Sequence, residues 1–116
     1  MKLFGISNCD TVKKARAWLA ARDLAAEFHD FKKHGVSEAM LRGWLEQTGR
    51  DQLLNRRGTT WRQLPEEARN EIVDDATAVA LMLAKPSVIK RPVLEKDGRI
   101  HLGFDETTYQ EIFGLE

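Results

Sequence analysis

The chain has 116 residues with 18 basic and 18 acidic side chains, and 42% of its residues are hydrophobic. This length supports one core, so we expect residues 1–116 to form a single domain, and the composition is that of a globular protein. A formal net charge of zero gives no global electrostatic case for binding nucleic acid or an anionic membrane. No apolar run approaches the ~20 residues that a membrane span needs.

The N-terminal segment and the cysteine count bear on the compartment in which the protein is expected. Lys2 is followed by a few largely apolar residues and then by polar Ser7, which does not match a secretory or amphipathic targeting segment. A single cysteine excludes an internal disulfide and fits a reducing compartment. We therefore expect a cytoplasmic protein that binds neither nucleic acid nor membrane.

The first thirty residues show a β-α-β pattern. Residues 2–7 predict a strand, Asp10 or Thr11 is expected to cap a helix that ends near Asp23, and residues 26–30 predict a second strand. Two strands joined by a helix over this length are expected to be parallel with a right-handed crossover. The apolar helix positions recur at intervals of three and four: Val12, Ala15, Trp18 and Leu19.

Residues 36–85 are predicted to form a helical insertion. Ser37 is expected to cap a helix that ends at Gly49. Pro65 is expected to open a second helix. A third helix is expected to begin at Asp74 or Asp75 and to end before Pro86.

The C-terminal part predicts a hairpin and a final helix. Residues 93–94 and 100–102 are expected to be strands joined by a turn at Asp97-Gly98. Asp105 is expected to cap the last helix. The order β-α-β, insertion, β-β-α predicts an α/β fold of the thioredoxin-like plan, in which a cysteine follows the first strand and a proline precedes the third. Cys9 and Pro92 occupy these two places.

Cys9 is the only thiol in the chain, and it lies between the first strand and the first helix. The unpaired N–H groups and positive dipole end of a helix favour the thiolate, which is the nucleophilic form. Lys13, Lys14 and Arg16 add positive potential. The alternative is that Cys9 is a small buried apolar residue without reactivity.

Five stretches together resemble the arsenate reductase-related family that includes ArsC and Spx, and most closely its small YffB-like branch. The resemblance implies a thioredoxin-like domain with a helical insertion, Cys9 as redox nucleophile, Arg91 as anion ligand and Pro92 as a cis-proline that contributes to the binding site. A guanidinium can stabilise a thiolate and bind an oxyanion or carboxylate through two hydrogen bonds. The stretches are residues 4–14, 28–35, 53–64, 81–94 and 103–109.

The chain also departs from the patterns of this family. Val12 stands where the thioredoxin and Spx patterns have a second cysteine, and Gly5 stands where the ArsC pattern has a histidine. A second family arginine aligns near Asn55, which leaves Arg56 or Arg57 as substitutes, and a third has no counterpart. We therefore expect weak or no reduction of arsenate.

Other residues near Cys9 are weaker candidates. Asn8, Asp10 and Thr11 are predicted to contact an anion or glutathione alongside backbone N–H groups, and ordinary helix capping is the alternative. His29 is either a base for Cys9 or a structural histidine. The histidines have no supporting carboxylate pattern, so no metal is expected.

Two classes of function fit these observations. The first is a glutathione-dependent thiol or disulfide oxidoreductase, in which Cys9 forms a mixed disulfide and Arg91 holds an anionic part of the substrate. The expected reactants are a small anionic or thiol substrate, glutathione as co-substrate, and glutathione or glutaredoxin as reductant. The second is an Spx-like module that binds protein or senses redox state without turnover. A monomer is expected in either case.

Overall fold

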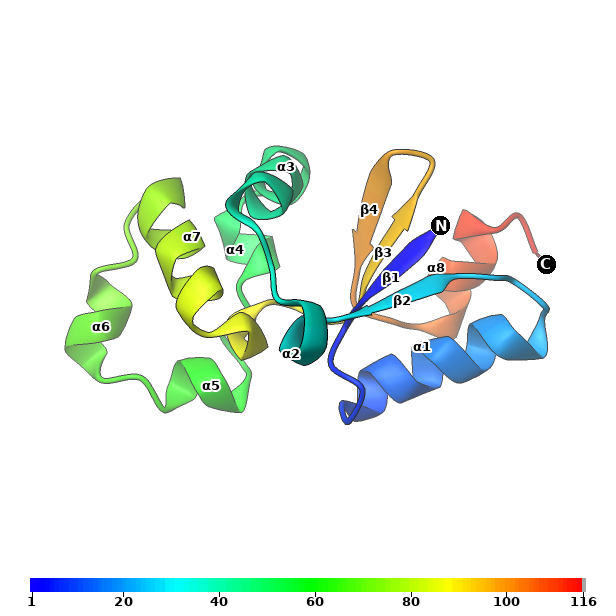
Figure 1. Ribbon diagram of the computed structural model, residues 1–116, viewed down its shortest axis with the longest axis horizontal. Helices are drawn as coiled ribbons and strands as arrows, with labels where there is room; N and C mark the ends of the chain where they lie inside the picture. The colour runs from blue at the N-terminus through cyan, green and yellow to red at the C-terminus, as the bar shows by residue number, and fades with distance from the viewer. Residues whose placement is uncertain (116) are drawn as a thin grey trace. The chain divides into compact units, whose positions relative to one another are not determined.

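The computed structural model describes residues 1–115 as two compact units (Figure 1). The first unit comprises Met1–Asp30 and the described residues from Arg91 onward, and the second comprises Phe31–Lys90. The expectation that the whole chain is one domain stays a prediction.

The first unit contains a four-stranded sheet in the order β2-β1-β3-β4. β1 (Lys2–Gly5) pairs in parallel with β2 (Glu27–Asp30) and antiparallel with β3 (Val93–Lys96), which pairs antiparallel with β4 (Arg99–Leu102). Together with the flanking helices, this order is the predicted thioredoxin-like plan, and the fold class is confirmed.

Two helices, α1 (Asp10–Ala21) and α8 (Glu106–Ile112), pack on the same face of this sheet. The indole of Trp18 lies edge-on to the ring of Tyr109, with ring centroids 5.5 Å apart. Such aromatic pairs add to the free energy that burial of apolar surface contributes. The buried cluster that joins helices and sheet is Leu3, Ala15, Trp18, Leu19, Leu94 and Tyr109.

The hairpin between β3 and β4 has the predicted turn. Asp97 has a φ of 54° and Gly98 a φ of 77°. A two-residue hairpin of this type needs a positive φ at both central residues, and aspartate followed by glycine tolerates this conformation. The turn sets the register in which Glu95 lies opposite Ile100.

The second unit is helical. Its two longest helices, α3 (Glu38–Thr48) and α7 (Asp75–Ala84), pack against each other. Leu41, Trp44 and Met82 are buried, and an isolated bridge pairs Leu54 with Ile89. The shorter elements are α2 (Phe31–His34), α4 (Arg50–Leu53), α5 (Thr59–Arg62), α6 (Glu66–Asn70) and the 3-10 helix η1 (Pro86–Val88).

The sequence pattern did not predict α2, α4 or η1. Each has only three or four residues, which is too short for an apolar period to develop. The first strand is also shorter than residues 2–7, since it ends at Gly5. The predicted cap at Ser37 is confirmed, because its hydroxyl oxygen accepts the N–H of Met40 at 3.2 Å.

We expect Ser37→Ala to lower the free energy of unfolding by about 1 kcal/mol, because the N–H of Met40 loses its acceptor at the start of α3. Urea unfolding followed by circular dichroism measures the change. Ser37→Asp is the matched control, since aspartate also caps helices and should keep the stability of the natural protein. Equal stability of the Ala and Asp variants would contradict the role of this cap.

Candidate functional site

Cys9 lies at the N-cap of α1. The chain leaves β1 through a turn in which the N–H of Cys9 donates to the carbonyl of Ile6 at 3.1 Å. Cys9 then has an extended backbone (φ −84°, ψ 127°), and its carbonyl accepts the first helical hydrogen bond, from Lys13 at 2.9 Å. The expectation that Asp10 or Thr11 caps this helix is therefore wrong, because the turn places the thiol itself at the cap.

The surroundings of Cys9 favour its thiolate. Partial burial of the sulfur acts to raise its pKa, but the net effect of the surroundings is to lower it. The opposing causes are the N–H of Val12, the guanidinium of Arg91 through a hydrogen bond and its charge, and the N–H of Thr11. Helix N–H groups and a fixed cation stabilise the negative sulfur, as expected for a reactive thiol.

The pairing of β1 with β3 brings Arg91 to Cys9. Phe4 lies opposite Val93 in this antiparallel pair. Arg91 precedes Val93 by two residues, so it arrives at the end of β1 from which the turn to Cys9 departs. The Arg91–Pro92 peptide bond is cis, as the resemblance implied. Pro92 is buried, and its carbonyl accepts the N–H of Gly103 at 2.9 Å.

The other residues predicted around Cys9 belong to the same short segment. Asn8 is exposed in the turn, Asp10 is exposed as the first residue of α1, and Thr11 is half-buried in the first helical turn. The backbone N–H of Thr11 faces the sulfur. Binding roles for these three side chains stay predictions.

Arg56 and Arg57 lie in the second unit. Arg56 forms an ion pair with Asp51 at 3.0 Å, and its guanidinium lies 5.4 Å from the ring centroid of Trp61. Arg57 is exposed. Participation of either arginine in binding at Cys9 stays a prediction.

The histidines have environments of their own. The ring of His29 packs on that of Phe4 with centroids 5.0 Å apart, and it is not among the groups that lower the pKa of Cys9. Burial, followed by the charges of Lys96 and Arg99, lowers the pKa of His101. Within residues 1–115, no group of three or more His, Cys, Asp or Glu side chains is arranged to hold a metal ion.

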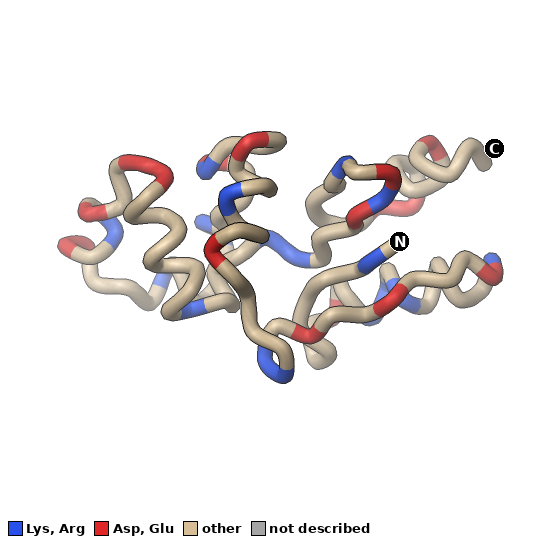
Figure 2. Tube along the Cα trace, turned by 45° about the horizontal axis from the view of Figure 1, so that its top comes forward, with Lys and Arg blue, Asp and Glu red and all other residues tan. Residues whose placement is uncertain are grey.

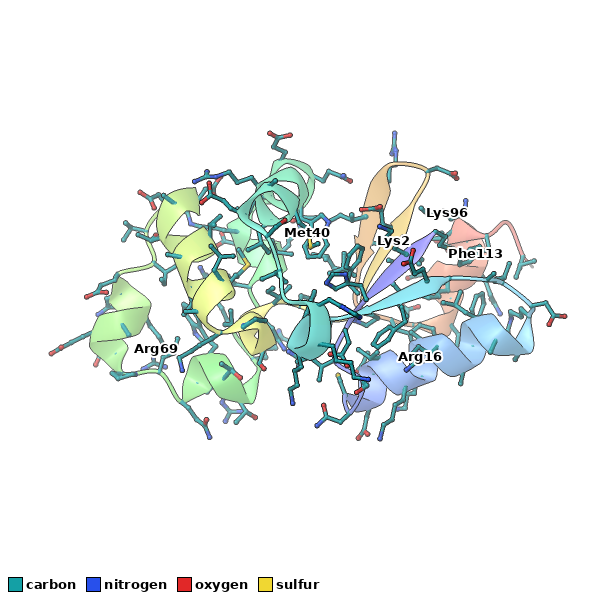
Figure 3. The ribbon with its side chains drawn as sticks, viewed as in Figure 1. Lys2, Arg16, Met40, Arg69, Lys96 and Phe113 are labelled. Atoms are coloured by element: carbon teal, nitrogen blue, oxygen red, sulfur yellow. The ribbon has the colours of Figure 1, made fainter. Side chains whose placement is uncertain are left out.

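A groove of about 470 Å³ lies between the C-terminal half of α1 and the start of β2. Arg16, on α1 (Figure 3), forms part of its lining and stacks over Phe28 at 4.2 Å. The groove residues of α1 run from Arg16 to Ala20, away from the N-terminus of the helix. The groove is therefore separate from the Cys9 site.

Charged residues of both signs occur in both units, and five acidic residues lie between Glu66 and Asp75. Figure 2 shows acidic and basic residues interspersed along the trace. Near the sulfur, Lys13 and Lys14 are exposed in the first turns of α1. In the part of the chain that the structure describes, no helix is long and apolar enough to span a membrane.

Sequence reasoning missed one feature of this site, which is the role of Cys9 as the N-cap residue. The preference of Asp and Thr for caps pointed to the next two positions. The available signal was Ser7-Asn8, a polar pair suited to a turn that ends at Cys9.

The sheet order, the thiol at the start of α1 and the cis-proline before β3 define a thioredoxin-like protein. The model of the ArsC family matches residues 4–112, and the chain belongs to this family.

Relatives and solved structures agree with this assignment. An uncharacterized protein of Haemophilus influenzae is 41% identical over 96% of both chains. The global transcriptional regulator Spx of Streptococcus pyogenes is 26% identical over 90% of this chain and 78% of its own. The structure of the YffB (PA3664) protein has a TM-score of 0.88 at 48% identity, covering 94% of this chain and 95% of its own. An arsenate reductase (ArsC) related protein from Brucella melitensis has a TM-score of 0.77 at 49% identity, covering 99% and 97%.

We expect the alkylation rate of Cys9 by iodoacetamide to rise with pH around a midpoint below the value of about 8.5 for a free cysteine. Arg91→Ala should raise this midpoint, because the sulfur loses a hydrogen bond and a positive charge. Lys90→Ala is the matched control for loss of a neighbouring cation. Identical midpoints in the natural protein and Arg91→Ala would show that the guanidinium does not act on the thiol.

The lowered pKa of Cys9 also predicts a pH-dependent stability. The folded protein holds the thiolate better than the unfolded chain does, so this stabilisation is fully present above the unfolded pKa of about 8.5. It is lost as the pH falls through the folded pKa. We expect the difference in free energy of unfolding between the natural protein and Cys9→Ser to grow with pH across this window, measured by urea unfolding under reducing conditions. A difference that does not change with pH would contradict the lowered pKa.

Proposed function

We propose that this protein is a glutathione-dependent thiol or disulfide oxidoreductase that works through Cys9 alone. The observation that carries the proposal is the position of the sulfur, which faces two backbone N–H groups and the guanidinium of Arg91. Because the chain has a single cysteine, any disulfide formed at Cys9 must be reduced by a thiol from another molecule.

In the proposed cycle the Cys9 thiolate attacks one sulfur of a disulfide. A mixed disulfide forms at Cys9, and the other sulfur leaves as a thiolate. The thiolate of glutathione or of a glutaredoxin then attacks the mixed disulfide and releases Cys9 as a thiolate. The external thiol is then joined in a disulfide to the half of the substrate that Cys9 had bound. A second external thiol attacks this disulfide, so the two electrons that reduce the substrate come from two external thiols, and Cys9 returns to its starting state.

Arg91 is proposed to bind the anionic part of the substrate as well as the thiolate. A guanidinium offers two parallel donors to a carboxylate, and glutathione carries two carboxylates. Further contacts to the substrate or to glutathione are proposed for Asn8, Asp10 and Thr11, which adjoin Cys9 in the chain. Pro92, which follows Arg91, is proposed as another contact. Arsenate is not proposed as a main substrate, because Gly5 and Gly103 stand near positions where the ArsC pattern has a histidine and an arginine.

An Spx-like role in binding protein without turnover is the second candidate function. It is favoured by the seven Spx proteins, each 26% identical to this chain. Val12 stands in place of the second cysteine of the Spx switch, so any redox sensing here uses a different disulfide. This difference favours the oxidoreductase.

We expect oxidised glutathione to add one glutathionyl group to the natural protein and none to Cys9→Ser, as measured by intact mass. Addition of a glutaredoxin system should then remove the adduct. Arg91→Lys should weaken adduct formation by about 1–3 kcal/mol, because lysine keeps the charge and loses the two-pronged geometry.

The natural protein without added thiol is the second control. Turnover of a disulfide substrate without added thiol would contradict the single-cysteine cycle. An unchanged mass after treatment with oxidised glutathione would also contradict it. Stable capture of a protein partner without any adduct would favour the Spx-like alternative.

A further inference from the structure

Gly5 and Val12 face each other beneath the first turn of α1. Gly5 is the last residue of β1, and Val12 is completely buried in the first turn of the helix. A Cβ atom added to Gly5 would lie 2.7 Å from Cγ2 of Val12 and 3.4 Å from its Cγ1. A separation of 2.7 Å is well below van der Waals contact, so β1 and α1 approach this closely only because residue 5 has no side chain.

The backbone at Gly5 does not need glycine for its conformation. Its φ is outside the left-handed region, unlike that of Gly35, Gly98 or Gly103. The requirement at this position is therefore purely steric. A single methyl group would have to displace the side chain of Val12, which is fully enclosed by the core.

Val12 contributes more than its side chain. Its backbone N–H faces the sulfur of Cys9, and the N–H of Thr11 beside it does the same. A shift of the helical turn that carries Val12 moves these two N–H groups with it, because they belong to the same turn. The position of the donors relative to the sulfur thus depends on how closely Val12 packs on Gly5.

We propose that Gly5 and Val12 are positioning residues for the reactive thiol: their contact holds the first turn of α1 at the distance from β1 that aims its N–H groups at the Cys9 sulfur. Neither side chain touches the substrate in this inference. This inference rests on the proposed function only in one respect, which is that Cys9 is the reacting group.

Two substitutions at the contact provide the test. Gly5→Ala introduces the 2.7 Å approach and should raise the midpoint of iodoacetamide alkylation by about half a pH unit or more, toward the 8.5 of a free thiol. In the double variant Gly5→Ala/Val12→Ala the nearest atom to the new Cβ is the Cβ of residue 12, at 3.7 Å. This is an ordinary contact, so the double variant should recover a midpoint close to that of the natural protein.

Gly43→Ala is the matched control. Gly43 lies in α3, and a Cβ there meets nothing within 4 Å, so the midpoint should not change. If the substitutions act only by lowering stability, Gly5→Ala and Gly5→Ala/Val12→Ala should have the same alkylation midpoint. If Gly5→Ala displaces the N–H groups, only the single variant should have a raised midpoint. Circular dichroism of each variant establishes that the fold is retained.

Two outcomes would overturn the inference. One is a folded Gly5→Ala protein with the midpoint of the natural protein. The other is a folded double variant with the midpoint of a free thiol, and this result decides the question if Gly5→Ala alone does not fold. Iodoacetamide needs no glutathione, so a natural protein that forms no glutathione adduct would refute the proposed function and leave this test intact.

Discussion

β1 ends at a glycine whose missing side chain leaves room for Val12, and this contact brings the start of α1 against the sheet. The turn from Ile6 to Cys9 fits into the short distance that remains, closed by one backbone hydrogen bond. Because the turn is so short, Cys9 occupies the N-cap of the helix. The reactivity argued for its thiol depends on this tight connection between strand and helix.

The charge on the sulfur is balanced by groups from two distant parts of the chain. The N–H groups of Thr11 and Val12 are local, whereas Arg91 comes from the segment before β3. The local N–H groups act on the sulfur at the end of β1, and the cation that forms a hydrogen bond with it is Arg91. The antiparallel pairing of β1 with β3 brings the guanidinium of Arg91 to the sulfur.

Two of the departures from the family patterns meet in one place. Gly5 replaces a histidine of the ArsC pattern and Val12 replaces a second cysteine, and these two residues are in contact. Cys9 is the one thiol of the chain, so in the proposed cycle the second thiol belongs to another molecule.

Helices, caps and turns could be predicted from the sequence where each depends on residues that are neighbours in the chain. The apolar period of α1, the cap at Ser37 and the Asp97-Gly98 turn are examples. Elements of three or four residues, such as α2 and η1, escaped prediction because they contain no complete period. The general preference for Asp and Thr caps led to the wrong cap residue for α1, since it takes no account of where the strand ends.

The sequence by itself determined that a lone cysteine lies between a strand and a helix, and its resemblance to a family pointed to Arg91. The residue pattern could not place Arg91 beside Cys9 or Gly5 against Val12. These contacts join residues on different elements, so they depend on strand register and on the packing of a helix against a sheet. Only the tertiary structure decides such distances, because no local rule fixes how closely two elements approach.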